Sequence, residues 1–195
     1  MMTATVAKLL WAAGIVGWYV IRYPFQRRAA RQGVVRSAGG MEDRIVLLIA
    51  ATGQFFAPLF YVVTGQPAFA DYPFNAVQGW LGLAALVGAL VLFRFTHKQL
   101  GRYWSVSLET RAHHALVTDG LYGYVRHPMY SSFLLSAVAQ VLLLPNWIAG
   151  PVGLVGIGTL FFFRVDREEG LMIETFGDRY RDYMRQTARI VPWVY

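Results

Sequence analysis

Long runs without a charged residue constrain this sequence more than any other feature. No Asp, Glu, Lys or Arg occurs from Ile45 to Ala70, from Tyr72 to Phe93, or through the 37 residues from His127 to Phe163. A helix needs about 20 predominantly apolar residues to cross the hydrocarbon layer of a membrane. The two shorter runs therefore predict one span each. The long run predicts two spans, with Pro145-Asn146 as the turn between them.

The N-terminal run from Leu9 to Ile21 has two interpretations. It has the length of the apolar part of a secretory signal, but it contains bulky Trp11, Trp18 and Tyr19 and precedes no small-residue cleavage site. These features favour a retained first span, which brings the number of spans to five. A composition of 56% apolar and 15% charged residues agrees with a membrane protein.

The basic residues predict the orientation of the five spans. Seventeen of the 18 Lys and Arg residues follow span one, span three or span five, and only Lys8 lies on the opposite side. Because cytoplasmic loops carry the excess of Lys and Arg, the N-terminus is expected outside and the C-terminus in the cytoplasm. We interpret the net charge of +7 as topology and contact with anionic lipid head groups, not as a nucleic-acid surface.

We therefore expect an all-α, multi-pass membrane protein with two regions. Residues 1–97 hold three transmembrane spans, at about 5–22, 45–65 and 75–95. Residues 98–195 form a cytoplasm-facing catalytic and cofactor-binding region around a short helical hairpin. That region contains spans four and five, at about 128–144 and 147–164, and a C-terminal amphipathic helix. Gly82 in span three predicts a close approach between helices.

The stretch that leads into span four is the first that could carry chemistry. Pro128 suits the first position of a helix, where its missing N–H is not needed. His127 would then lie at the entrance of this helix, where free N–H groups and the helix dipole favour an anion. The alternative is structural: His127 caps the helix, and Arg126 reaches out to the membrane surface.

A second charged group follows span five and contains Arg164, Glu168 and Glu169. On its own it could be a solvated helix end with an Arg164–Glu168 pair one turn apart. The hairpin returns both of its ends to the same membrane face, so His127 and Arg164 are expected within reach of each other. Ionisable groups at this depth are costly unless they are used, so their convergence favours a functional site.

Other kinds of site have little support in the sequence. The chain has no cysteine, which excludes disulfides, thiolate ligands and cysteine nucleophiles. The four histidines lack the spacing of a zinc site, so no metal is expected. No glycine-rich phosphate loop follows a strand, and no nucleic-acid partner is expected.

Several motifs follow one another in the C-terminal half: His114-Ala115-Leu116-Val117, Gly120-Leu121-Tyr122, Arg126-His127-Pro128-Met129-Tyr130, Arg164 with Glu168-Glu169, and Phe176-Gly177 with Tyr180 and Tyr183. In this order, with a helical hairpin before the fourth, they resemble the isoprenylcysteine carboxyl methyltransferase family from about Leu100 to the C-terminus. The Arg-His-Pro core alone is less specific, because it is similar to one in phospholipid methyltransferases and sterol reductases.

The resemblance implies S-adenosyl-L-methionine as methyl donor and S-adenosyl-L-homocysteine as product. Carried over by position, the cofactor-binding residues are His114, Ala115, Leu116, Val117, Tyr122, His127, Pro128, Met129, Tyr130 and Glu168. Arg164 takes the position assigned to the substrate, and Arg164 and Glu168 are the candidate catalytic residues. The implied acceptor is the carboxylate of a prenylated cysteine, or a similar lipophilic group that enters from the bilayer.

Methyl transfer to a carboxylate suits these residues, because the acceptor is already ionised at neutral pH. The reaction then needs alignment and exclusion of water more than a strong base. We expect Arg164 to hold the acceptor, Glu168 to bind a polar group of the cofactor, and His127 to receive the cofactor's carboxylate. Open alternatives are a phospholipid N-methyltransferase, an NADPH-dependent enzyme of the sterol-reductase type, and a non-catalytic membrane scaffold or transporter.

Overall fold

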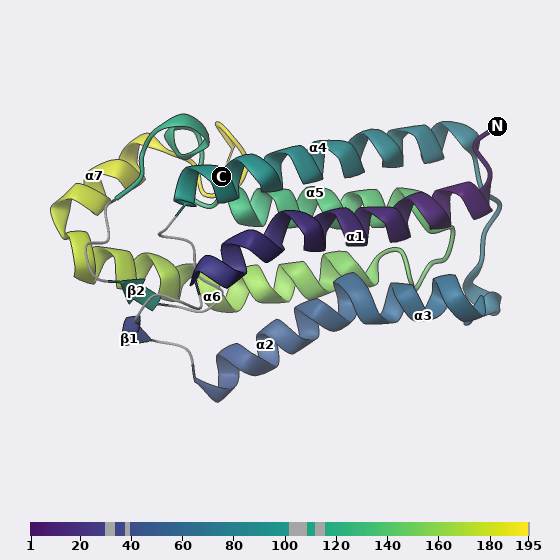
Figure 1. Cartoon of the computed structure of the whole chain (residues 1–195), viewed down its shortest axis with the longest axis horizontal. Helices are drawn as coiled ribbons and strands as arrows, with labels where there is room; N and C mark the ends of the chain where they lie inside the picture. Colours follow the sequence, from purple (N-terminus) through teal and green to yellow (C-terminus); the bar gives the residue numbers. More distant parts are fainter. Residues whose placement is uncertain (30–33, 38–39, 102–108, 112–115, 195) are drawn as a thin grey trace.

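The computed structural model describes residues 1–29, 34–37, 40–101, 109–111 and 116–194. Its long helices lie side by side along one axis (Figure 1). The N-terminus lies at one end of this bundle, and α7 (Asp178–Gln186) lies at the other. We call the end with α7 the polar end. It comprises the start of α2, residues 116–127 and residues 164–194.

Among the described residues of the N-terminal half, three helical stretches are long and apolar enough to cross a membrane. They are α1 (Ala4–Ala29), the continuous stretch Met41–Thr64, and α4 (Ala76–Leu100). The second stretch consists of α2 (Met41–Ala51), a π-helical turn η1 (Thr52–Phe56) and α3 (Ala57–Thr64). A 3-10 turn, η2 (Ala68–Ala70), lies in the loop before α4. Each stretch overlaps one of the three spans expected from the apolar runs.

Two further helices, α5 (Pro128–Leu143) and α6 (Val152–Phe176), form a hairpin. Asn146 organises its turn: the side-chain oxygen accepts hydrogen bonds from the N–H groups of Ile148 and Ala149, at 3.0 and 2.8 Å. The Asn146 amide donates to Asp71 Oδ1 at 2.7 Å, which ties the turn to the loop between α3 and α4.

The second helix of the hairpin is longer than the span expected at 147–164. It continues to Phe176 as one helix, so Glu168 and Glu169 lie inside α6. Gly177, with a φ of 60°, separates α6 from α7. The residues expected to form one C-terminal amphipathic helix are therefore divided between the end of α6 and α7.

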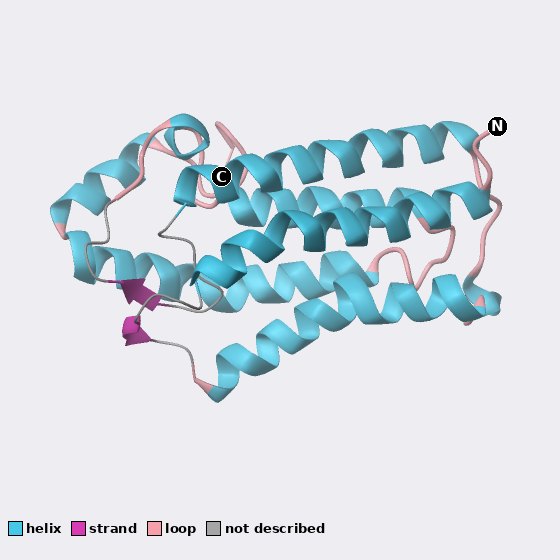
Figure 2. Ribbon diagram, viewed as in Figure 1, coloured by secondary structure: helices cyan, strands magenta, loops and turns pink. Residues whose placement is uncertain are grey.

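One small sheet departs from the all-helical expectation within the described residues (Figure 2). β1 (Val34–Ser37) pairs antiparallel with β2 (Glu109–Arg111) and links the loop after α1 to the loop after α4. Residue patterns do not reveal such pairs, because backbone N–H and C=O groups of one loop can find partners in another loop whatever their side chains. A 3-10 turn, η4 (Gly120–Gly123), then leads toward α5.

Glycines let the helices approach closely at two crossings. A Cβ on Gly82 of α4 would lie 2.9 Å from Cβ of Leu142 in α5, which confirms the close approach expected there. A Cβ on Gly53 of η1 would lie 2.5 Å from the backbone oxygen of Val152 in α6. Small residues allow such contacts between membrane helices. The second crossing fixes the stretch Met41–Thr64 against the hairpin.

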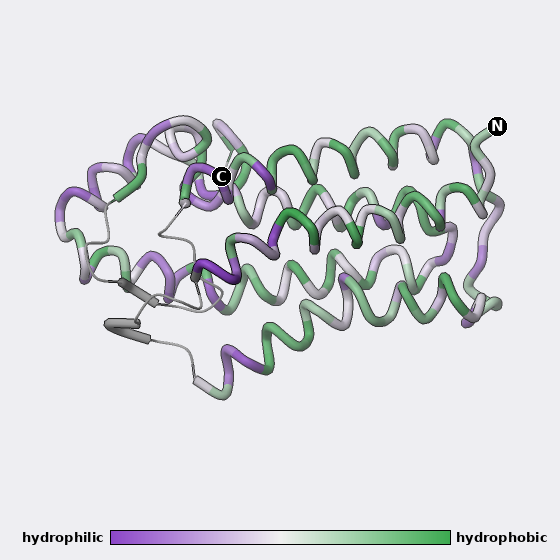
Figure 3. Tube along the Cα trace, viewed as in Figure 1, coloured by the Kyte–Doolittle hydropathy of each residue, from purple (hydrophilic) through white to green (hydrophobic). Residues whose placement is uncertain are grey.

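Hydropathy changes along the axis of the bundle (Figure 3). Apolar residues dominate along the helices, and hydrophilic residues gather at the polar end. Large apolar side chains such as Val63 and Trp80 lie on the outside, 75% and 59% exposed. Exposed apolar surface of this kind is typical of contact with lipid. The charged side chains of the polar end therefore lie next to a surface suited to a membrane.

We predict that Gly53→Ala destabilises the protein, because the added methyl group would meet the backbone oxygen of Val152. Overpacking of this kind costs about 1–3 kcal/mol, so the thermal midpoint in detergent should fall by a few degrees. Gly158→Ala in α6 is the matched control, since nothing lies within 4 Å of its Cβ position. Equal effects of the two substitutions would contradict the importance of the close approach.

Candidate functional site

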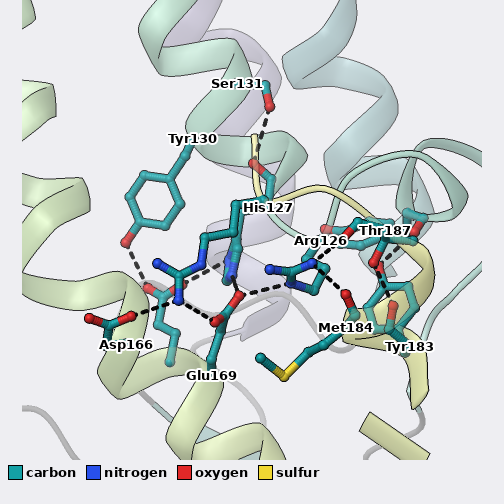
Figure 4. A network of polar contacts seen from close by, with 12 residues as sticks. Arg126, His127, Tyr130, Ser131, Asp166, Glu169, Tyr183, Met184 and Thr187 are labelled. Carbon is teal, nitrogen blue, oxygen red and sulfur yellow. Dashed lines mark hydrogen bonds and ion pairs between the residues drawn. The ribbon is translucent and has the colours of Figure 1, made fainter. Parts of the chain in front are cut away.

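Three segments that are far apart in the sequence meet at the polar end. Residues 124–130 lead into α5, residues 164–169 lie in the second half of α6, and residues 187–190 follow α7. The hairpin brings the first two segments together. The chain after α7 then returns to the same place, so that the side chains of all three segments form one polar network (Figure 4).

Backbone hydrogen bonds hold the segment before α5 against the C-terminal tail. The N–H groups of Arg126 and His127 donate to the carbonyl oxygens of Ala188 and Arg189, at 2.8 and 2.9 Å. The N–H of Ala188 donates to the carbonyl oxygen of Tyr124 at 3.3 Å. The positions of Arg126 and His127 therefore depend on the tail as well as on α5.

The side chain of Arg126 joins α6 to the end of α7. Its Nε donates to Glu169 Oε1 at 2.8 Å, and its Nη1 donates to the carbonyl oxygens of Met184, at 3.1 Å, and Thr187 (Figure 4). Only 8% of this side chain is exposed. The interpretation in which Arg126 reaches out to the membrane surface is therefore wrong.

His127 lies between two adjacent carboxylates. Its Nδ1 is 3.4 Å from Glu168 Oε2, and its Nε2 is 3.2 Å from Glu169 Oε1. Burial alone would lower the pKa of His127, but the hydrogen bonds and negative charges of Glu168 and Glu169 outweigh it and raise the pKa above its usual 6.5. The site thus favours the imidazolium form. His127 occupies the N-cap position of α5, as the capping interpretation expects, but its side chain makes no cap hydrogen bond and faces the two carboxylates instead.

Glu168 is the junction between three side chains. The Tyr130 hydroxyl donates to Oε1 at 2.8 Å, Arg164 Nη2 lies 3.4 Å from the same oxygen, and His127 faces Oε2. Burial alone would raise the pKa of Glu168, but His127, Arg164 and the Tyr130 hydrogen bond lower it. Its side chain is 22% exposed, against 8% for Arg164, so Glu168 is more accessible to a ligand.

Glu169 forms the other half of the cluster. Its Oε1 accepts a hydrogen bond from Arg126, and its Oε2 accepts one from Arg189 at 2.9 Å. Arg189 also donates to Asp166 at 2.8 Å. Burial would raise the pKa of Glu169, but the hydrogen bonds from His127 and Arg126 lower it to about 2. Glu169 is therefore a charged anchor for the surrounding cations, with 3% of the residue exposed.

Arg164 has a second acidic neighbour, which comes from α2. Its Nε lies 3.0 Å from Asp43 Oδ1, and both residues are buried, at 6% and 4% exposed. The contact lacks the alignment of a hydrogen bond, so charge attraction dominates it. The sequence did carry a signal for Asp43: a carboxylate beside an apolar run needs a partner if the helix end is buried.

The residues expected at the site have different positions in the structure. Those that come together in one cluster are His127, Tyr130, Arg164 and Glu168. Pro128 and Met129 belong to the first turn of α5. Tyr122 is buried in η4, where its carbonyl oxygen accepts from the Tyr183 hydroxyl at 2.6 Å. Leu116 and Val117 are half-buried before η4, and His114 and Ala115 lie outside the described residues.

The first turn of α5 has N–H groups available for a ligand. Pro128 has no N–H, and within the described residues those of Met129 and Tyr130 have no hydrogen-bond acceptor. Unused N–H groups at the start of a helix, beside the imidazolium of His127, suit a carboxylate. Among the residues that the structure describes, no group of three or more His, Asp or Glu side chains could hold a metal ion. The arrangement suits a ligand that carries both negative and positive charge.

Residues 80–174 match the model of the isoprenylcysteine carboxyl methyltransferase (ICMT) family. The matched residues, just under half of the chain, are therefore similar to that family. It contains His127, Tyr130, Arg164 and Glu168, whereas Asp43 and the C-terminal tail lie outside it.

Relatives agree with this match. The chain is 29% identical over 122 residues to protein-S-isoprenylcysteine O-methyltransferase from Dictyostelium discoideum, which covers 60% of this chain and 50% of that protein. It is 34% identical over 77 residues to methanethiol S-methyltransferase 1 from Bradyrhizobium diazoefficiens, 39% of this chain and 26% of that one. The chain thus spans half the length of the first relative and about a quarter of the second.

A solved structure shares the fold. The eukaryotic intramembrane Ras methyltransferase ICMT superposes with a TM-score of 0.52 and 21% identity, over 80% of this chain and 55% of that chain. With the three long apolar helices, this similarity shows that the chain is a membrane protein with an ICMT-like fold.

The charge cluster predicts how stability depends on pH. Glu169 has a pKa lowered from 4.5 to about 2, so its stabilising contribution is complete above 4.5 and is lost as pH falls toward 2. His127 has a pKa raised above 6.5, so its contribution is complete below 6.5 and is lost as pH rises through the raised value. Both contributions are complete between pH 4.5 and pH 6.5, and we expect the thermal midpoint in detergent to decline below and above this range. His127→Gln should remove much of the alkaline decline. An unchanged alkaline decline in this variant would contradict the assignment.

Proposed function

We propose that the protein is an integral membrane methyltransferase that uses S-adenosyl-L-methionine. The observation that carries this proposal is the convergence of His127, Tyr130 and Arg164 on Glu168, within the region that matches the ICMT family. The acceptor we propose is the carboxylate of a prenylated cysteine or of a similar lipophilic molecule. The name of the Dictyostelium relative supports this acceptor.

We further propose five membrane spans, with the N-terminus outside and the polar end in the cytoplasm. α5 and the first half of α6 would supply spans four and five, because no charged residue occurs from His127 to Phe163. All Lys and Arg residues except Lys8 then fall on the cytoplasmic side. The site would lie at the membrane face, so that the lipid part of an acceptor enters sideways from the bilayer.

The residues present fit S-adenosyl-L-methionine, which carries a carboxylate, an ammonium and a sulfonium group. The free N–H groups of Met129 and Tyr130 would donate to its carboxylate, beside His127. Glu168, which is partly exposed, would accept a hydrogen bond from a cationic or hydroxyl group of the cofactor. The ring of Tyr122 would face the sulfonium, a favourable cation–π contact. Leu116, Val117, Pro128, His114 and Ala115 complete the proposed contacts. When bound, this cofactor supplies a methyl group on a positively charged sulfur.

The chain's own residues would act through orientation and charge. An acceptor carboxylate is already ionised, and the raised pKa of His127 keeps this residue protonated, so no base is needed or offered there. Arg164 would hold the acceptor carboxylate, while Glu168 and Asp43 hold Arg164. Burial of the cluster keeps water away and strengthens these charge interactions.

A thiol acceptor is the second candidate. The methanethiol S-methyltransferase relative favours it, and so does the charge of Arg164, which already faces the carboxylates of Asp43 and Glu168. A thiol would have to lose its proton, however. The lowered pKa of Glu168 makes this carboxylate a weak base, so we prefer an acceptor that is already ionised.

We predict that S-adenosyl-L-homocysteine binds the detergent-solubilised protein and that Glu168→Gln weakens this binding at least tenfold. A tenfold loss is about 1.4 kcal/mol, as expected when one charge-assisted hydrogen bond is removed. Calorimetric titration measures both affinities, with NADPH as a separate ligand. Asp178→Asn is the matched control, because this carboxylate is 92% exposed and, among the described residues, pairs with Arg181 of its own helix.

Two results would refute the proposal: no binding of S-adenosyl-L-homocysteine to the folded wild type, or equal binding by folded Glu168→Gln. Turnover assays with radiolabelled S-adenosyl-L-methionine then compare three acceptors: N-acetyl-S-farnesylcysteine, methanethiol and phosphatidylethanolamine. Methylation of the first at the highest kcat/KM supports the carboxylate acceptor, and preference for the second supports the thiol.

A further inference from the structure

α2 contributes a charged residue to the site, although it lies outside the ICMT-matching residues 80–174. Asp43 occupies the first turn of α2 and is 4% exposed. Its neighbour Glu42 has a side chain that is 75% exposed and pairs with Arg167 of α6 at the surface. Two acidic residues in succession thus bridge the same two helices, one in solvent and the other buried beside the candidate site.

Attachment of α2 to α6 does not by itself explain a buried ion pair. Taking two charges out of water costs several kcal/mol, and well-packed apolar residues in their place often stabilise a protein at least as much as the buried ion pair does. The two helices already meet closely: a Cβ on Gly156 of α6 would lie 3.2 Å from Cα of Ala50 in α2. The exposed Glu42–Arg167 pair joins them further out. The pair between Asp43 and Arg164 therefore suggests a role in the site.

The guanidinium of Arg164 is held at two of its nitrogens. Nε faces Asp43 Oδ1 at 3.0 Å, and Nη2 faces Glu168 Oε1 at 3.4 Å. Within the described residues, no hydrogen bond from Nη1 is found, and neither of the two contacts to the carboxylates is made through it. Arg164 and Glu168 are one helical turn apart, and arginine forms two parallel hydrogen bonds with a carboxylate when it is free to turn. The pull of Asp43 on Nε opposes that closed arrangement.

We propose that Asp43 is a positioning residue for methyl transfer: it holds Arg164 away from a closed pair with Glu168 and leaves Nη1 for the acceptor carboxylate. Asp43 itself touches neither acceptor nor cofactor. It acts through the orientation of Arg164, and it also lowers the net positive charge that a carboxylate meets there. The proposal rests on the methyltransferase function proposed above and assigns to α2 a part in acceptor recognition.

The test compares wild type, Asp43→Asn, Asp43→Glu and Glu42→Gln in detergent, with N-acetyl-S-farnesylcysteine as acceptor. For Asp43→Asn, we expect kcat/KM for the acceptor to fall at least tenfold. KM for S-adenosyl-L-methionine and Kd for S-adenosyl-L-homocysteine should stay within about threefold of wild type, since Glu168 keeps its contacts with His127 and Tyr130. Asp43→Glu keeps the charge but displaces it by one methylene, so its acceptor kcat/KM should lie between those of wild type and Asp43→Asn. Glu42→Gln, the matched control, should match wild type in both constants.

The outcomes separate this proposal from the proposed function. Wild type that binds no S-adenosyl-L-homocysteine and methylates no acceptor refutes both. Active wild type with an unchanged acceptor kcat/KM in Asp43→Asn overturns the role of Asp43 alone. Equal loss of cofactor affinity and acceptor turnover would also overturn it, because that pattern indicates a structural role. If Asp43→Asn does not fold, Asp43→Glu decides: an acceptor KM raised at least threefold with cofactor KM unchanged supports the proposal, and wild-type constants reject it.

Discussion

Two adjacent carboxylates on α6 organise the polar end of the bundle. Successive residues on a helix point about 100° apart, so Glu168 and Glu169 face different neighbours. The imidazole of His127 spans the gap between them, because its two nitrogens lie 3.4 and 3.2 Å from one oxygen of each. The arginines of the cluster then divide between the two carboxylates: Arg164 is held by Glu168, and Arg126 and Arg189 by Glu169.

This division separates an anchoring half from an accessible half. Glu169 is surrounded by cations that are themselves tied to the tail, and its pKa near 2 means that its charge persists at any ordinary pH. Because the buried carboxylate of Glu169 is paired at both oxygens, it adds rigidity to this half of the cluster. Glu168 is partly exposed and shares its oxygens with a hydroxyl, an imidazole and a guanidinium. Of the two, Glu168 is the one whose contacts a ligand can enter.

Sequence patterns predicted the parts of this structure that depend on local chemistry. Apolar runs indicated the long helices, and Pro128 indicated the start of α5. The hairpin implied that His127 and Arg164 lie within reach of each other, and both contact Glu168. What the sequence did not predict depends on contacts between distant segments. The β1–β2 pair and the tail carbonyls that hold Arg126 have no signature in spacing or hydropathy. The carboxylate of Asp43 beside an apolar run indicates that a partner is needed, but it does not identify Arg164 as that partner. The continuation of α6 to Phe176 was missed for a related reason: its charged residues look like a helix end until their partners are known.

The position of Asp43 brings a charge from the N-terminal helices next to Arg164 in the candidate site. His127, Tyr130, Arg164 and Glu168 lie in the region that matches the family model, and we propose them for the cofactor and the acceptor. The charge around Arg164 also depends on α2, which lies outside that region. A neutral residue at position 43 would leave Arg164 with one carboxylate, and an acidic residue leaves it with two. With the function that we propose, a change in α2 would alter acceptor preference without altering the residues proposed for the cofactor.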